Sequence, residues 1–259
     1  MMRRIAPMLL AACLACAAAP ASAEQLVVAL SNPHVAINSN FIGENLVLFG
    51  TVAPDPGMST RPGGYDLVIT VSGPRVTLRT RRKARVLGIW VNVDSSEFVR
   101  VPSFLAILSN RPVQAIAPPE TLRRLQIGLD YYLLPQHIGP DIADTVRDDP
   151  FRVAFVRQQS QHDFYLESPN AVTYLTPAVF RAAIALPANV PVGNYAIDAK
   201  LFANGAMIAT ATTTLEVTKA GVEQYVAEAA TNYGLLYGLA TALMALFTGW
   251  VASAVFRRD

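Results

Sequence analysis

The histidines are the first side chains to consider for acid–base or metal chemistry. The chain has three, His34, His137 and His162, and they form neither an H-x-x-x-H nor an H-E-x-x-H pair. His162 and Asp163 are adjacent and could form half of an acid–base unit, but such a pair is more often the solvated end of a helix. We therefore predict no metal site from these residues.

Nucleophiles and phosphate-binding loops are equally sparse. The sequence contains no G-x-S-x-G elbow, no G-x-G-x-x-G fingerprint and no glycine-rich loop followed by the lysine that a bound phosphate needs. The two cysteines, Cys13 and Cys16, both lie in the first 23 residues, which we predict to be removed. The sequence thus predicts no enzyme and no cofactor, with a hydrolase of unrecognised site as a minority alternative.

Neighbouring acids occur at Asp148-Asp149 and in the segment from Asp94 to Glu97. The first pair precedes Pro150 and is typical of a helix N-terminus, where an aspartate caps the first turn. The second fits a turn. Calcium sites need a denser set of oxygen ligands than either segment offers, so we predict no calcium site.

The densest charged feature is a basic cluster, which we call the basic arm. The alternation of Val76 and Leu78 predicts that these two side chains face a core and that their neighbours face solvent. The arm suits an anionic contact, either lipid head groups or an acidic patch on a protein partner, and each basic group near an anionic surface contributes about 1 kcal/mol. A solvated hairpin tip is the plainer alternative. The arm comprises Arg79, Arg81, Arg82, Lys83 and Arg85.

Residues 233–256 carry no charge and are long enough to cross a bilayer as a helix. The small residues Gly234, Gly238, Ala242 and Gly249 recur along this segment, a spacing that lets another helix approach closely. We predict a transmembrane helix that packs against a membrane protein or a second copy of the chain, with plain anchoring as the alternative. The preceding residues, from about 221, are predicted to continue as a short stalk.

The N-terminus has the pattern of an export signal. Arg3 and Arg4 precede an apolar run that ends at Ala21-Ser22-Ala23, which predicts a signal peptide over residues 1–23. A first membrane anchor and a lipoprotein signal at Cys13 are alternatives. Arg257 and Arg258 follow the span and favour a cytoplasmic tail at residues 257–259. The expected protein is single-pass in the inner membrane, with its bulk in the periplasm.

Between the two apolar ends, turn residues separate short runs of apolar and β-branched residues. Residues 24–115 and 166–219 predict β-strands, with a strong hairpin at Asn204-Gly205, and residues 116–165 predict a helical stretch. We expect a mainly β, immunoglobulin-like antiparallel β-sandwich, in which the later strands complete the first sandwich or form a second. The net charge of +2 predicts no nucleic-acid partner.

Four segments carry a resemblance to a known family. They are FIGENLVLFG at residues 41–50, T-P-x-x-F-R at 176–181, LPANVPVGNY at 186–195, and the terminal span. With these segments the chain resembles the family known as alphaproteobacterial putative transmembrane proteins. The resemblance implies a Gram-negative source, an inner-membrane location and a transporter neighbour, and it assigns no catalytic residue.

These observations lead to two functional hypotheses. The first is a membrane-anchored periplasmic interaction protein, accessory to an inner-membrane transporter or envelope complex, which also contacts membrane lipid. The second is a small-anion-binding module that serves a transporter and uses the basic arm as its site.

Overall fold

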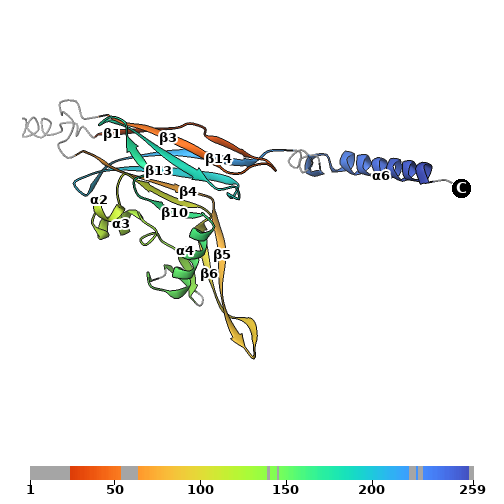
Figure 1. Ribbon diagram of the computed structural model, residues 1–259, viewed down its shortest axis with the longest axis horizontal. Coiled ribbons are helices and arrows are strands. Elements are labelled where there is room, and N and C mark those ends of the chain that lie inside the picture. The colour runs from red at the N-terminus through yellow and green to blue at the C-terminus, as the bar shows by residue number, and fades with distance from the viewer. Residues whose placement is uncertain are drawn as a thin grey trace, which may run out of the picture.

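The computed structural model describes residues 24–53, 64–138, 141–144, 146–221, 226 and 230–256. The predicted signal peptide (residues 1–23), the predicted tail (257–259) and part of the predicted stalk (222–225 and 227–229) lie outside these residues. The described part is mainly β-structure, with a C-terminal apolar helix that extends away from the strands (Figure 1). The predicted mainly β fold class is therefore confirmed.

One sheet has four antiparallel strands. Their order is β1 (Gln25–Leu30), β3 (Glu44–Ala53), β12 (Val179–Leu186) and β11 (Val172–Tyr174). β12 lies beside β3 with Ala182 opposite Leu48. A strand from before the helical stretch therefore pairs directly with one from after it.

The second sheet has six strands. Antiparallel ladders join the four central strands, and each edge strand pairs in parallel with its neighbour. The order is β10 (Tyr165–Ser168), β7 (Leu105–Ser109), β4 (Asp66–Ser72), β13 (Gly193–Ala203), β14 (Ala206–Lys219) and β2 (His34–Ile37). Because β13 pairs with β4 as well as with β14, the early and late strands also share this sheet.

The two sheets pack face to face around one apolar core. β12 shows how the sequence builds it: Phe180, Ala182, Ile184 and Leu186 are buried, and the residues between them are exposed. This period-2 burial is what a strand with one covered face requires. The facing strands contribute residues that include Leu67, Ile69 and Val71 of β4, and Tyr195, Ile197, Ala199 and Leu201 of β13.

A second core covers the other face of the six-stranded sheet. The middle five residues of β4 are all buried, because Val68 points away from the sandwich into this second cluster. The cover is an insertion between β7 and β10 that contains α2 (Val113–Ile116), α3 (Pro119–Leu125), β8 (Pro135–Ile138), β9 (Asp141–Asp144) and α4 (Pro150–Gln161). The ring of Phe155 stacks on Phe98 with ring centroids 4.5 Å apart and anchors α4 to this core.

The insertion is less helical than the predicted helical stretch. The sequence predicted a helical stretch over residues 116–165, but α3 ends at Leu125 because Gln126 adopts a left-handed conformation with φ 54°. The following residues make turns and the β8–β9 hairpin. α4 begins where the Asp148-Asp149 pair predicted a helix N-terminus, and the Asp149 carboxylate caps it by accepting from the backbone N–H of Arg152 at 2.9 Å.

The third sheet is built on a long hairpin. β5 (Arg75–Val86) and β6 (Ile89–Pro102) pair antiparallel, and β8 and β9 add to the base of β6. Beyond that base the hairpin projects from the body, as Figure 1 shows. The turn lies at Leu87-Gly88, so residues 81–85 continue the strand rather than forming the tip that the sequence suggested.

Candidate functional site

The basic arm lies along β5. Arg79 pairs with Glu97 at 3.4 Å, and Arg82 pairs with Asp94 at 3.5 Å, each across to β6. Arg85 donates from Nε to the carbonyl oxygen of Gly88 at 3.1 Å and so supports the turn. Arg81 and Lys83 are exposed, and neither makes an ion pair with a described residue. The structure thus brings the five cations onto one strand but balances two of them with carboxylates.

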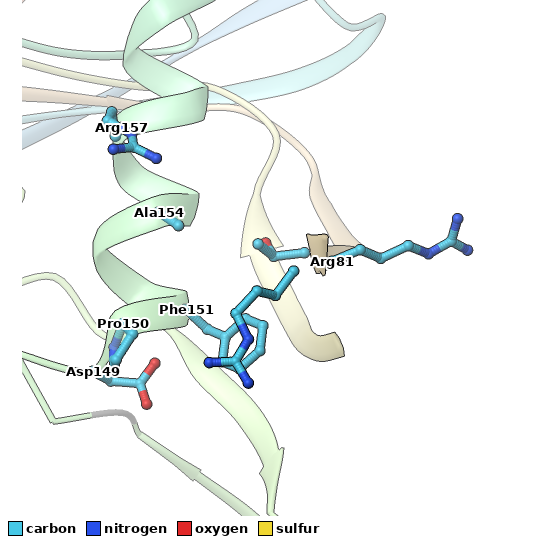
Figure 2. Close-up of a pocket in the computed structure, with 8 residues that line it drawn as sticks. Arg81, Asp149, Pro150, Phe151, Ala154 and Arg157 are labelled. Carbon is cyan, nitrogen blue, oxygen red and sulfur yellow. The ribbon is translucent and has the colours of Figure 1, made fainter. Parts of the chain in front are cut away.

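A groove separates the hairpin from the N-terminal half of α4. Its volume is about 330 Å³. Figure 2 shows Phe151 reaching toward the hairpin, Arg157 farther along α4, and the Arg81 side chain extending away from the helix. Asp149 also lines the groove, where its carboxylate is already used as the helix cap. The groove therefore combines cations with one carboxylate and an apolar floor.

The tip of the hairpin is apolar and open to solvent. Leu87 is 100% exposed, Trp90 69% and Ile89 65%. Sequence analysis missed this feature, because it placed the hairpin tip at the basic arm and not at residues 87–88. The available indication was Gly88 between two apolar runs, a two-residue turn that alternation alone does not detect.

The histidines are not assembled into a site. His34 lies on β2 and approaches Glu216 at 3.5 Å, while His137 is exposed on β8. His162 ends α4 and contacts the carbonyl oxygen of Gln158 through Nδ1 at 2.8 Å. Among the described residues, no group of three or more histidine, cysteine or acidic side chains is arranged to hold a metal ion.

The C-terminal helix α6 (Gly234–Phe256) makes a separate surface. Within the described residues, 21 of its positions, Gly234–Ala254, form a helix long and apolar enough to cross a membrane, and none of that length is buried. At 100° per residue, Gly234, Gly238, Ala242 and Gly249 fall within an arc of about 80°. No other part of the described structure lies within 4 Å of a Cβ built on any of the three glycines.

A family model described as "Putative transmembrane protein (Alph_Pro_TM)" matches residues 25–258. The chain belongs to this family. Family membership and the candidate span together make the protein a single-pass membrane protein. Compared with curated proteins, this Alph_Pro_TM chain has no significant match.

For the Alph_Pro_TM chain, the match extends over both the strands and the span. The segments that carried the resemblance also meet in space. FIGENLVLFG leads into β3, T-P-x-x-F-R enters β12, and the two strands pair with Gly50 opposite Phe180. The third segment ends β12 and enters β13, which ties the two sheets together.

Proposed function

We propose that this protein is a non-enzymatic interaction protein of the inner membrane, with its strands in the periplasm and its C-terminus in the cytoplasm. The partner is a membrane protein, such as a transporter or an envelope complex, that packs against α6. The observation that carries the proposal is the small-residue face of α6, which no other described residue covers.

The argument for a helical partner is one of close approach. Gly234, Gly238 and Gly249 present no side chain, so a second helix can come near enough for backbone-to-backbone packing. In lipid this packing replaces the hydrophobic effect as the source of helix association. The leader-like N-terminus and the Arg257-Arg258 pair support the orientation.

The test is crosslinking of the full chain in native membranes, followed by mass spectrometry. We expect a crosslinked adduct with another membrane protein that weakens in the Gly234→Leu/Gly238→Leu variant. The matched control is Ala240→Leu/Ala254→Leu, which adds nearly the same bulk about 180° around the helix and should leave the adduct intact. Recovery of the monomer alone would reject the proposal, and recovery of the dimer alone would replace the partner with a second copy.

The groove beside α4 favours a second candidate, a small-anion-binding module that serves a transporter. Arg82 and Arg157 line this groove, and arginine suits oxyanions because its guanidinium can donate two parallel hydrogen bonds. Asp149 in the same groove opposes an anion. Calorimetry of the full chain in detergent with sulfate, sulfite and phosphate tests this candidate. Binding of one of these anions that the Arg157→Gln variant loses would support it. The absence of heat with all three would reject it.

A further inference from the structure

The hairpin tip has the backbone of a turn that its sequence does not favour. Leu87 and Gly88 have φ values of 49° and 87°, the left-handed pair that defines a type I′ hairpin turn. Asparagine or glycine is the usual first residue of such a turn, whereas a leucine there carries a steric cost. An exposed leucine at this position weakens the fold locally and buries nothing in return.

The same chain contains the favoured version of this turn. Asn204 and Gly205 join β13 to β14 with φ values of 50° and 82°. The two turns therefore share a backbone conformation and differ at the first residue, asparagine in one and leucine in the other. The stability of the turn explains why asparagine occupies position 204. It does not explain leucine at position 87. Strained positions of this kind concentrate where a chain contacts a partner.

The neighbours of Leu87 describe that partner. Ile89 and Trp90 extend the apolar surface on the β6 side of the turn, and Val86 is 45% exposed on the β5 side. Behind this tip lie the exposed cations Arg81 and Lys83. The hairpin thus carries aliphatic and tryptophan side chains at its tip and basic side chains behind them. This order matches an anionic bilayer surface, in which acyl chains lie beneath negatively charged head groups.

The chain itself supplies the membrane. Residues 220–233 connect β14 to α6. β5 alone has 12 residues, so at about 3.3 Å per residue the hairpin arm is about 40 Å long. The body and its hairpin arm are therefore tethered to the bilayer that holds α6.

We infer that the β5–β6 tip is a second membrane contact, which inserts Leu87, Ile89 and Trp90 at the surface of a bilayer rich in anionic phospholipid. Arg81 and Lys83 then lie at the level of the head groups. This contact would hold the body against the membrane at a point away from α6. It is independent of the partner proposed for α6, because it uses a different surface and a different ligand.

Tryptophan fluorescence of the reconstituted full chain tests the inference. The chain has two tryptophans, so Trp250→Phe leaves Trp90 as the single reporter. The protein is placed in vesicles of phosphatidylcholine alone or mixed with phosphatidylglycerol, with bromine on the acyl chains as a quencher. We expect strong quenching of Trp90 and a blue-shifted emission in the vesicles that contain phosphatidylglycerol, and much weaker effects in phosphatidylcholine.

Two variants assign the contact to the tip. In the single-tryptophan background, Leu87→Asn should lower the ratio of quenched to unquenched Trp90 about tenfold, because one buried leucine side chain is lost. Arg81→Gln/Lys83→Gln should lower it about fivefold for each charge removed. Leu87→Asn adopts the residue type of the other turn, so the variant is expected to fold.

The matched controls remove the same groups elsewhere. Leu175→Asn replaces a leucine that is 53% exposed and directly follows β11, and Arg124→Gln/Arg181→Gln removes two exposed charges. Neither control should change the quenching. Unquenched, water-exposed Trp90 in the anionic vesicles would overturn the inference, as would equal quenching in both lipids or an unaltered signal in Leu87→Asn. A blue shift that appears only with added membrane proteins would also overturn it, in favour of a protein partner.

Discussion

Arg152, which is only 4% exposed, donates a hydrogen bond from Nη2 to the main-chain carbonyl oxygen of Tyr132 at 2.6 Å. The same nitrogen approaches the carbonyl oxygens of Leu129 and Asp130, each at 3.4 Å. The guanidinium of this α4 residue thus provides a hydrogen-bond donor to carbonyl oxygens of the loop that follows α3. Burial lowers the pKa of Arg152, and the nearby Asp144 and Asp130 carboxylates oppose this effect by favouring the charged form.

The first prediction concerns this buried guanidinium. Arg152→Met should lower the free energy of unfolding by roughly 2–4 kcal/mol, because it leaves buried carbonyl oxygens without a donor. Guanidinium chloride unfolding of the full chain in detergent, followed by circular dichroism, measures the change. The control is Arg157→Met, an exposed residue of the same helix, which should stay within about 0.5 kcal/mol of wild type. Equal losses in the two variants would contradict this account.

The second prediction concerns Gly50 and Phe180, which lie opposite each other on β3 and β12. A Cβ at residue 50 would lie 2.2 Å from the Phe180 Cζ, and that ring is fully buried. Gly50→Ala should therefore destabilise the protein by about 1–3 kcal/mol through overpacking. The same unfolding measurement provides the test.

A second substitution separates overpacking from a loss of backbone freedom. Phe180→Leu removes the atoms that clash, so the double variant should be more stable than the sum of the two single effects predicts. A strictly additive double variant would show that contact with the ring is not the cause. Both residues also lie in segments that carried the family resemblance, Gly50 in residues 41–50 and Phe180 in residues 176–181.

The strands and one turn were predictable because their determinants are local. β12 buries every second residue, a pattern that its own sequence sets, and Asn204-Gly205 indicated the hairpin between β13 and β14. The pairing of β12 with β3 was not predictable, since it joins residues more than 100 positions apart. Whether the late strands formed a second sandwich therefore remained open until the register was known.

The basic arm shows the same limit within a single hairpin. Its five cations are evident in the sequence, but which of them are paired depends on where the turn falls. With the turn at Leu87-Gly88, Arg79 faces Glu97 and Arg82 faces Asp94. Leucine in a left-handed turn runs against local preference, so the sequence misplaced the turn and with it the apolar tip.

The third prediction is a loss of stability at alkaline pH. Burial is the main cause that raises the pKa of Tyr132, Tyr165, Tyr174 and Tyr195 above the usual value of about 10. Above about pH 10 these side chains ionise in the unfolded chain but stay neutral in the folded one, so the free energy of unfolding falls as pH rises. Lys200 acts in the opposite direction, because burial lowers its pKa.

Tyr195→Phe isolates one of these contributions. Its hydroxyl donates to the carbonyl oxygen of Pro191 at 2.5 Å, and the residue is 1% exposed. The decrease in unfolding free energy from pH 9 to pH 11 should be about 1.4 kcal/mol smaller in the variant than in wild type. Lys200 is common to both proteins and cancels in the comparison. An identical pH dependence in the two would contradict the raised pKa of Tyr195.

The fourth prediction exchanges the first residues of the two type I′ turns. Leu87→Asn should raise the free energy of unfolding by about 0.5–1 kcal/mol, because asparagine tolerates the left-handed conformation that strains leucine. Asn204→Leu should lower it by a similar amount, since φ at this residue is 50° against 49° at Leu87. Denaturant unfolding in detergent, without bilayer lipid, measures both changes apart from any membrane contact. If Leu87→Asn is more stable and also loses its lipid contact, Leu87 lowers local stability but contributes to binding. If Leu87→Asn is less stable, Leu87 supports the fold itself.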